Sequence, residues 1–189
     1  MAAVPVIVIL FTSIAPSADE IIGNQVNAKL SNNNYNYNKI TVDNLISELL
    51  NKNNQYNLID LRSKEEYKKS HIPLAINIPF DQIKNYEWEN YFTQKFKTNI
   101  FYSDNVEEAK RAYLFAEYLG DAKRALLTEP ISTYFAEVNP QKSNAALNND
   151  AVINWRVESH QELIEKEKFL SKFSAPVKKK VLKIKGGCS

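Results

Sequence analysis

The sequence predicts an α/β fold in which a parallel sheet is flanked by helices. Short apolar runs alternate along the chain with segments whose apolar residues repeat at helical spacing. The apolar fraction of 44% and the charged fraction of 24% are those of a folded globular protein. A length of 189 residues allows one well-buried domain with appendages. We therefore expect a single core rather than two enzymatic lobes.

The expected elements begin at Thr41, which is a plausible cap for a helix carrying the apolar residues Leu45, Ile46, Leu49 and Leu50. Strands are predicted over residues 57–61, 75–79, 99–102 and 124–128, and helices over residues 107–120 and 131–138. Strands separated by helices pair in parallel through right-handed crossovers. Because sites in such sheets lie beyond the carboxyl ends of strands, the turns after Leu61 and Tyr102 are the candidate positions.

The first 39 residues differ in composition from this core. Residues 2–15 are uninterrupted apolar or small residues, and we expect residues 1–22 to be an export or membrane-anchor segment. A buried strand of the domain is the alternative for this run, and a cytoplasmic location is the alternative to export or anchoring. Residues 23–39 are rich in asparagine, including NNNYNYN, and are predicted to be a linker because they offer little to bury.

The last 49 residues are basic. Residues 141–189 hold ten Lys or Arg against five Asp or Glu. We expect a partly helical or disordered tail, with a helix over residues 158–173 and a lysine-rich terminus ending in GlyGlyCysSer. The lysines are interpreted as a solvated tail in preference to a lipid or nucleic-acid contact.

Composition excludes several classes of function. The formal charge is only +2, so we expect no nucleic-acid partner. Cys188 is the single cysteine, which excludes an internal disulfide and a CxxC pair. The two histidines, His71 and His160, are too few and too far apart in sequence to indicate a metal site, and we expect no metal and no cofactor.

Residues 58–79, LIDLRSKEEYKKSHIPLAINIP, resemble the signature of the rhodanese-like domain. In that family a strand ending in Asp-x-Arg precedes an acidic-Tyr helix and a His-Ile-Pro-Gly-Ala turn. The resemblance covers about residues 40–140 and implies the rhodanese fold for them. It departs from the family at Leu74, where glycine is usual, so the turn there is reached either without a positive φ angle or with some strain.

The resemblance also implies that the loop after the third strand should begin with a catalytic cysteine that takes up sulfur as a persulfide. Here that position is Ser103, and a serine hydroxyl is neither a thiolate at neutral pH nor able to form a persulfide. The loop continues with Asp104, Asn105, Val106, Glu107 and Glu108, which place acids and valine where active members commonly have arginine and glycine. We expect no thiosulfate sulfurtransferase activity from this loop, although the same acids also suit the first turn of a helix.

Three residues of the signature are expected to be structural. Asp60 should accept hydrogen bonds from neighbouring loop backbone, and Arg62 should pair with Glu65 or Glu66. His71 is expected to be a local hydrogen-bonding residue rather than a catalyst.

Two functions remain open at this stage. The chain is either a rhodanese-like binding or docking module with an unknown protein partner or a small ligand, or a sulfur-relay protein in which Cys188 carries a persulfide between a donor and an acceptor. The loss of cysteine, glycine and basic residues from one loop favours the first. Membrane association is expected through residues 2–15.

Overall fold

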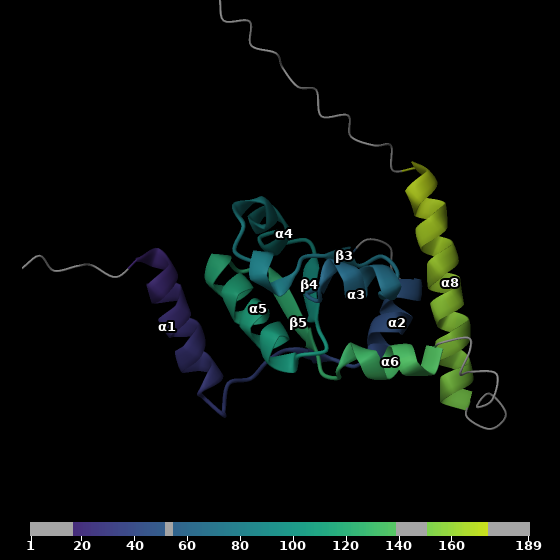
Figure 1. Cartoon of the computed structure of the whole chain (residues 1–189), viewed down its shortest axis with the longest axis horizontal. Coiled ribbons are helices and arrows are strands. Elements are labelled where there is room, and N and C mark those ends of the chain that lie inside the picture. Colours follow the sequence, from purple (N-terminus) through teal and green to yellow (C-terminus); the bar gives the residue numbers. More distant parts are fainter. Residues whose placement is uncertain (1–16, 52–54, 139–150, 174–189) are drawn as a thin grey trace, which may run out of the picture.

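The computed structural model describes residues 17–51, 55–138 and 151–173. Its centre is a five-stranded, wholly parallel sheet with the strand order β1-β5-β4-β2-β3. Helices cover both faces of the sheet, as predicted (Figure 1). The strands are β1 (Lys39–Ile40), β2 (Tyr56–Asp60), β3 (Ile76–Asn77), β4 (Thr98–Tyr102) and β5 (Lys123–Leu127). The helices are α1 (Ala18–Leu30), α2 (Val42–Asn51), α3 (Lys64–Lys69), α4 (Glu89–Phe92), α5 (Val106–Leu119), α6 (Ile131–Val138) and α8 (Ala151–Phe173), with short 3-10 turns at Phe80–Gln82 and Tyr86–Trp88.

The central strands are buried on both faces, and their side chains alternate between two cores. Ile59 of β2 and Phe101 of β4 belong to the core beneath α5, whereas Leu58 and Ile100 belong to the core that contains α2 and α6. This alternation explains why the strands read as continuous apolar runs in the sequence.

Local capping accounts for where several helices begin. The Thr41 Oγ1 accepts a hydrogen bond from the Asn44 amide at 3.3 Å, which confirms the predicted cap of α2. Ser63 and Glu66 form a reciprocal capping box at the start of α3. The predicted helices at residues 107–120 and 131–138 correspond to α5 and α6, with boundaries within one residue.

Part of the predicted linker at residues 23–39 is folded. α1 (Ala18–Leu30) begins within the predicted segment 1–22 and continues into the predicted linker, and its Val26 is buried in the core beneath α5. The following tyrosines continue the contact: Tyr35 donates to Glu117 Oε2 at 2.6 Å, and the rings of Tyr37 and Tyr113 meet edge to face. The linker prediction weighed the many asparagines and overlooked the few apolar and aromatic residues between them, which are what pack.

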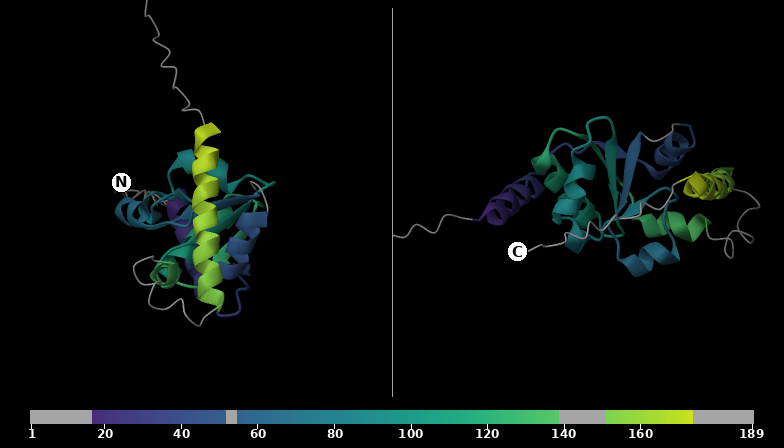
Figure 2. Two further views of the ribbon diagram at one scale, coloured as in Figure 1. Left: turned by 90° about the vertical axis from the view of Figure 1, so that its right-hand side faces the viewer. Right: turned by 90° about the horizontal axis from the view of Figure 1, so that it is seen from above.

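The helix expected in the basic tail is longer than predicted and is docked on the domain. α8 packs beside α2 and α6, at the end of the molecule away from α1 (Figure 1 and Figure 2). Leu163 of α8 is fully buried among α2 and α6 residues, and Arg156 forms ion pairs with Asp43 of α2 and Glu137 of α6. The Lys166 ammonium donates to the Leu49 carbonyl at the end of α2 at 2.7 Å.

Candidate active-site loop and its surroundings

The loop at Ser103–Glu108 lies where the fold places ligand sites in parallel sheets. β2 ends at Asp60 and β4 ends at Tyr102, and these two residues are paired in register. The turns after both strands therefore meet at one edge of the sheet, as the sequence predicted. Leu61 and Arg62 from the first turn and Ser103, Asp104 and Asn105 from the second line a common cavity of about 480 Å³.

Ser103 is buried, and its hydroxyl is held within the loop. The Oγ donates to Glu108 Oε2 at 3.2 Å and accepts from the Asn105 amide at 3.2 Å. Neither partner is a base aligned as in a serine hydrolase triad, because Glu108 is a carboxylate without an intervening imidazole. The hydroxyl therefore serves as a bridge between the loop backbone and the first turn of α5.

Three backbone amides around the start of α5 have acceptors within the loop. Asn105 caps the helix by accepting from the Glu107 amide at 3.1 Å, and its carbonyl accepts from the Glu108 amide at 3.1 Å. Together with the Asn105 amide, which donates to Ser103, three donors of this turn point to groups of the loop itself. An anion would have to displace these contacts to use the helix start as a cradle.

Asp104 links the loop to α6. Its Oδ1 accepts from the Ser132 amide at 2.7 Å in the first turn of α6, and its Oδ2 lies 3.9 Å from Nη1 of Arg62. A carboxylate at a helix N-terminus is favourable, because the first amides and the helix dipole both attract negative charge. This carboxylate thus stabilises α6 and also adds negative charge to the cavity.

The cavity in front of the loop is acidic. Its lining includes the carboxylates of Glu66, Asp81, Asp104 and Glu108, and one cationic side chain, Arg62. That guanidinium is committed elsewhere, since Nε and Nη2 donate to the Asp60 carboxylate at 3.0 and 2.7 Å. The cavity therefore presents a field that repels anions.

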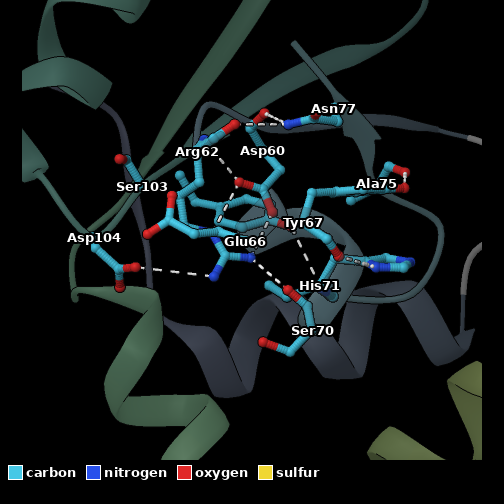
Figure 3. Close-up of polar contacts among 12 residues, drawn as sticks. Asp60, Arg62, Glu66, Tyr67, Ser70, His71, Ala75, Asn77, Ser103 and Asp104 are labelled. Atoms are coloured by element: carbon cyan, nitrogen blue, oxygen red, sulfur yellow. Dashed lines mark hydrogen bonds and ion pairs between the residues drawn. The ribbon is translucent and has the colours of Figure 1, made fainter. Parts of the chain in front are cut away.

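Arg62 is the centre of a buried polar cluster (Figure 3), and its predicted pairing with Glu65 or Glu66 is wrong. In addition to Asp60, it donates to the Ser70 carbonyl at 2.7 Å and lies 4.9 Å from the centre of the Phe135 ring. The buried position works against the charge of Arg62, but the hydrogen bonds and charge of Asp60 outweigh it and raise the pKa of Arg62. Asp60 also accepts from the Arg62 amide at 3.0 Å, which matches the expected backbone contact.

His71 lies on the other side of this cluster and contacts the helix before it. Its Nδ1 is 2.9 Å from the Tyr67 carbonyl, and its ring stacks on Tyr67 at 4.0 Å between centroids. Nε2 is 3.7 Å from Glu167 of α8. His71 lines a different cavity from Ser103, so the structure does not bring these two predicted residues together.

The turn that follows is reached with strain, the second of the two expected alternatives. Leu74 has φ 72°, a left-handed conformation that costs an L-residue about 1 to 2 kcal/mol. Its amide donates to Glu167 Oε1 at 2.8 Å. The contribution of α8 to this turn was missed, because nothing in the local sequence of residues 158–173 shows which part of the domain it contacts.

Cys188 and the apolar residues 2–15 lie outside the described residues. Within the described ranges, no group of three or more His, Cys, Asp or Glu side chains is arranged to hold a metal ion. Among the same residues, no helix is both long and apolar enough to cross a membrane.

Comparison with known proteins agrees with this geometry. The family model of the rhodanese-like domain matches residues 42–132. Residues 42–132 of the chain are similar to the rhodanese-like domain. The matched residues run from α2 to the start of α6, and they leave β1, α1 and α8 outside the matched range.

Among curated proteins, a probable molybdopterin-synthase adenylyltransferase of Porphyra purpurea is 38% identical over 55 residues, which is 29% of this chain. The match spans only 14% of that protein. Among solved structures, a single-domain sulfurtransferase of Saccharomyces cerevisiae is 22% identical, with 54% of this chain and 91% of that chain covered and a TM-score of 0.46. A rhodanese-related protein of Thermoplasma volcanium is 19% identical, with 53% and 93% covered and a TM-score of 0.45.

Proposed function

We propose that this rhodanese-like domain does not transfer sulfur from thiosulfate at its own loop and acts as a binding or docking module. The observation that carries the proposal is the Ser103 hydroxyl at the family's nucleophile position, hydrogen-bonded to Glu108. Sulfur transfer of the rhodanese type requires a thiolate that attacks sulfur and holds it as a persulfide. An alcohol oxygen supports neither step.

The charge of the cavity supports the same conclusion. Two like charges about 4 Å apart repel by about 4 kcal/mol at an effective dielectric constant near 20, and by about 1 kcal/mol in bulk water. Asp104 and Glu108 both line the cavity that thiosulfate would have to enter, and the one cation there, Arg62, is bound to Asp60. A cysteine alone would therefore not restore the site.

Cyanide-dependent formation of thiocyanate from thiosulfate tests this proposal. We expect the wild type to be inactive and Ser103→Cys to be nearly inactive, because the carboxylates remain. Adding Asp104→Asn and Glu108→Gln to Ser103→Cys should raise the rate at least about tenfold, which corresponds to about 1.4 kcal/mol. Ser31→Cys, at the exposed end of α1, controls for the effect of an added thiol.

Two outcomes would contradict the proposal. Robust turnover by Ser103→Cys alone would show that the carboxylates do not matter. Wild-type turnover that disappears in Cys188→Ser would establish the alternative, in which the C-terminal thiol is the sulfur carrier and the domain docks donor and acceptor. Repeating the assay with a persulfide donor in place of thiosulfate tests whether Cys188 accepts sulfur from another protein.

We further propose that the protein is exported or membrane-anchored through residues 2–15 and meets its protein partner there. The support is the apolar run itself, which has the length of a signal-peptide core. Cell fractionation with mass spectrometry of the mature N-terminus tests the location. A full-length chain recovered from the cytosol would contradict it.

A further inference from the structure

A second cavity, of about 640 Å³, lies between the end of α3, α6 and α8. It is larger than the cavity at Ser103 and falls within the size range of small-molecule sites. It is built partly from α8, which lies outside the residues that match the rhodanese-like family. The cavity is therefore a feature of this chain rather than of the matched domain.

One wall of this cavity is apolar. Phe135 and Val138 come from α6, Ile164 comes from α8, and Pro73 comes from the turn after α3. These side chains offer a surface on which a hydrocarbon or aromatic group gains about 25 cal/mol for each Å² that it removes from water. An apolar ligand group therefore binds this wall more favourably than water does.

The rest of the lining is mainly basic. Lys68 and Lys69 stand at the end of α3, and both histidines of the chain, His71 and His160, line the same space. The charge is opposite in sign to that of the Ser103 cavity, where carboxylates predominate. Phe135, which lines the basic cavity, stacks on Arg62, which lines the acidic one, so these two residues separate the cavities.

His160 offers a hydrogen-bond donor within the cavity lining. Its Nδ1 is 3.0 Å from the Tyr134 hydroxyl, and in the tautomer whose Nδ1 accepts from that hydroxyl the ring proton is on Nε2. Burial, followed by the charge of the neighbouring His71, lowers the pKa of His160 and so favours the neutral ring near pH 7. The Nε2–H of that tautomer makes no hydrogen bond among the described residues.

Glu167 is the one acidic side chain in the lining, and it is already engaged. Its Oε1 accepts from the Leu74 amide at 2.8 Å and lies 3.7 Å from Nε2 of His71. Two lysine side chains against this one glutamate leave the lining with a positive balance of charge.

We propose that this cavity binds a small amphipathic carboxylate, with its apolar body against Phe135 and Ile164 and its carboxylate between the lysines of α3 and Nε2 of His160. Each half of such a ligand matches one half of the lining. A neutral analogue would lose the attraction of the lysines, and an inorganic anion would lose the apolar contact. This inference is independent of whether the Ser103 loop is inactive.

Octanoate is a suitable probe, and octanamide is its neutral counterpart. Two-dimensional ¹H–¹⁵N spectra of the full chain, recorded during titration, should show saturable shifts at the amides of His71, Phe135 and Ile164. We expect a dissociation constant at or below about 1 mM for octanoate. The constant for octanamide should be at least about fivefold weaker.

Two variants locate the binding. Lys68→Glu combined with Lys69→Glu should weaken octanoate at least about fivefold and leave octanamide unchanged, whereas Ile164→Trp should fill the cavity and abolish both. Lys172→Glu, near the far end of α8, reverses one charge away from the cavity as a control and should have no effect. Because Lys68 and Lys69 are exposed, their double variant should fold, and it still tests the proposal if Ile164→Trp does not fold.

Four results would overturn the proposal. These are an absence of saturable shifts, equal affinity for octanoate and octanamide, shifts that map to residues 103–108 instead of the α3–α6–α8 cavity, and unchanged octanoate binding in the double lysine variant. Sulfur-transfer activity is not measured, so failure here is distinct from failure of the proposed function.

Discussion

Asp60 and Arg62 act as one unit at the carboxyl end of β2, because both are buried and each neutralises the other. Replacing one partner of a buried ion pair leaves an uncompensated charge, which costs about 3 to 5 kcal/mol. Asp60→Asn should therefore lower the free energy of unfolding by about 3 kcal/mol or more, as measured by urea denaturation. Glu65→Gln, an exposed change in the first turn of α3, should alter it by less than about 0.5 kcal/mol. Equal effects of the two changes would contradict this account.

Leu74 allows the cost of backbone strain to be separated from the loss of side-chain contacts. With φ at 72°, glycine relieves the strain and a β-branched residue increases it. Leu74→Gly should therefore unfold at a higher urea concentration than Leu74→Val, although valine keeps far more of the leucine side chain. The expected difference is at least about 1 kcal/mol in the free energy of unfolding. If Leu74→Val were as stable as Leu74→Gly or more stable, side-chain packing rather than backbone strain would dominate at this turn.

For single residues, the sequence predicted the position in the fold better than the partner of the side chain. Ser103, Asp104 and Arg62 were placed correctly at neighbouring strand ends, because the order of elements determines where parallel strands terminate. The partner of Arg62 was wrong because Glu65 and Glu66 are close in sequence, whereas the bent backbone after β2 turns the guanidinium back onto Asp60. The left-handed turn at Leu74 was recognisable only because the resemblance places glycine there.

Among the elements, those with apolar periodicity were predicted and those that depend on distant contacts were not. α2, α5 and α6 carry their own apolar stripes, and the inner strands are apolar runs. β1 has only two residues and forms because Asn38 and Ile40 accept from the amides of β5 and the residue after it. The packing of α1 and α8 depends on a few residues in mainly polar segments, so composition gave no indication of it.

The contact between α6 and α8 makes stability depend on pH through His160. Burial, followed by the charge of His71, lowers the pKa of His160 in the folded state, while Glu167 works in the opposite direction. The unfolded chain therefore binds more protons as pH falls below about 6.5, the ordinary value, and the folded state is destabilised. Each unit by which the folded and unfolded pKa values differ is worth about 1.4 kcal/mol.

We expect the free energy of unfolding to fall between about pH 7 and pH 5 and the slope to be smaller in His160→Gln. Urea denaturation across this range measures both. Carboxylates titrate in both proteins, so the difference between the two curves isolates the histidine. Parallel curves would show that His160 is protonated equally in the folded and unfolded states.

At the scale of the whole molecule, α8 completes the core on one face of the sheet and α1 covers part of the other. Leu163 is fully buried, and burial of a leucine contributes about 2 kcal/mol. Arg156 adds its contacts with Asp43 and Glu137, and Lys166 satisfies a carbonyl at the end of α2. α1 contributes less, because Val26 is its main buried side chain and its ion pair between Lys29 and Glu117 is partly exposed to solvent.

Truncation should show that α8 contributes more to stability than α1. A chain of residues 1–140 removes α8 and uncovers α2 and α6, and it should lose at least about 3 kcal/mol in the free energy of unfolding. A chain of residues 32–189 removes α1 but keeps Tyr35, Tyr37 and β1, and it should lose only about 1 to 2 kcal/mol. Urea denaturation of the three chains gives the order, and 1–140 unfolding at the same urea concentration as the full chain would contradict it. Since the family match ends at residue 132, such an order would show that the matched domain needs a helix from beyond its own boundary to be stable.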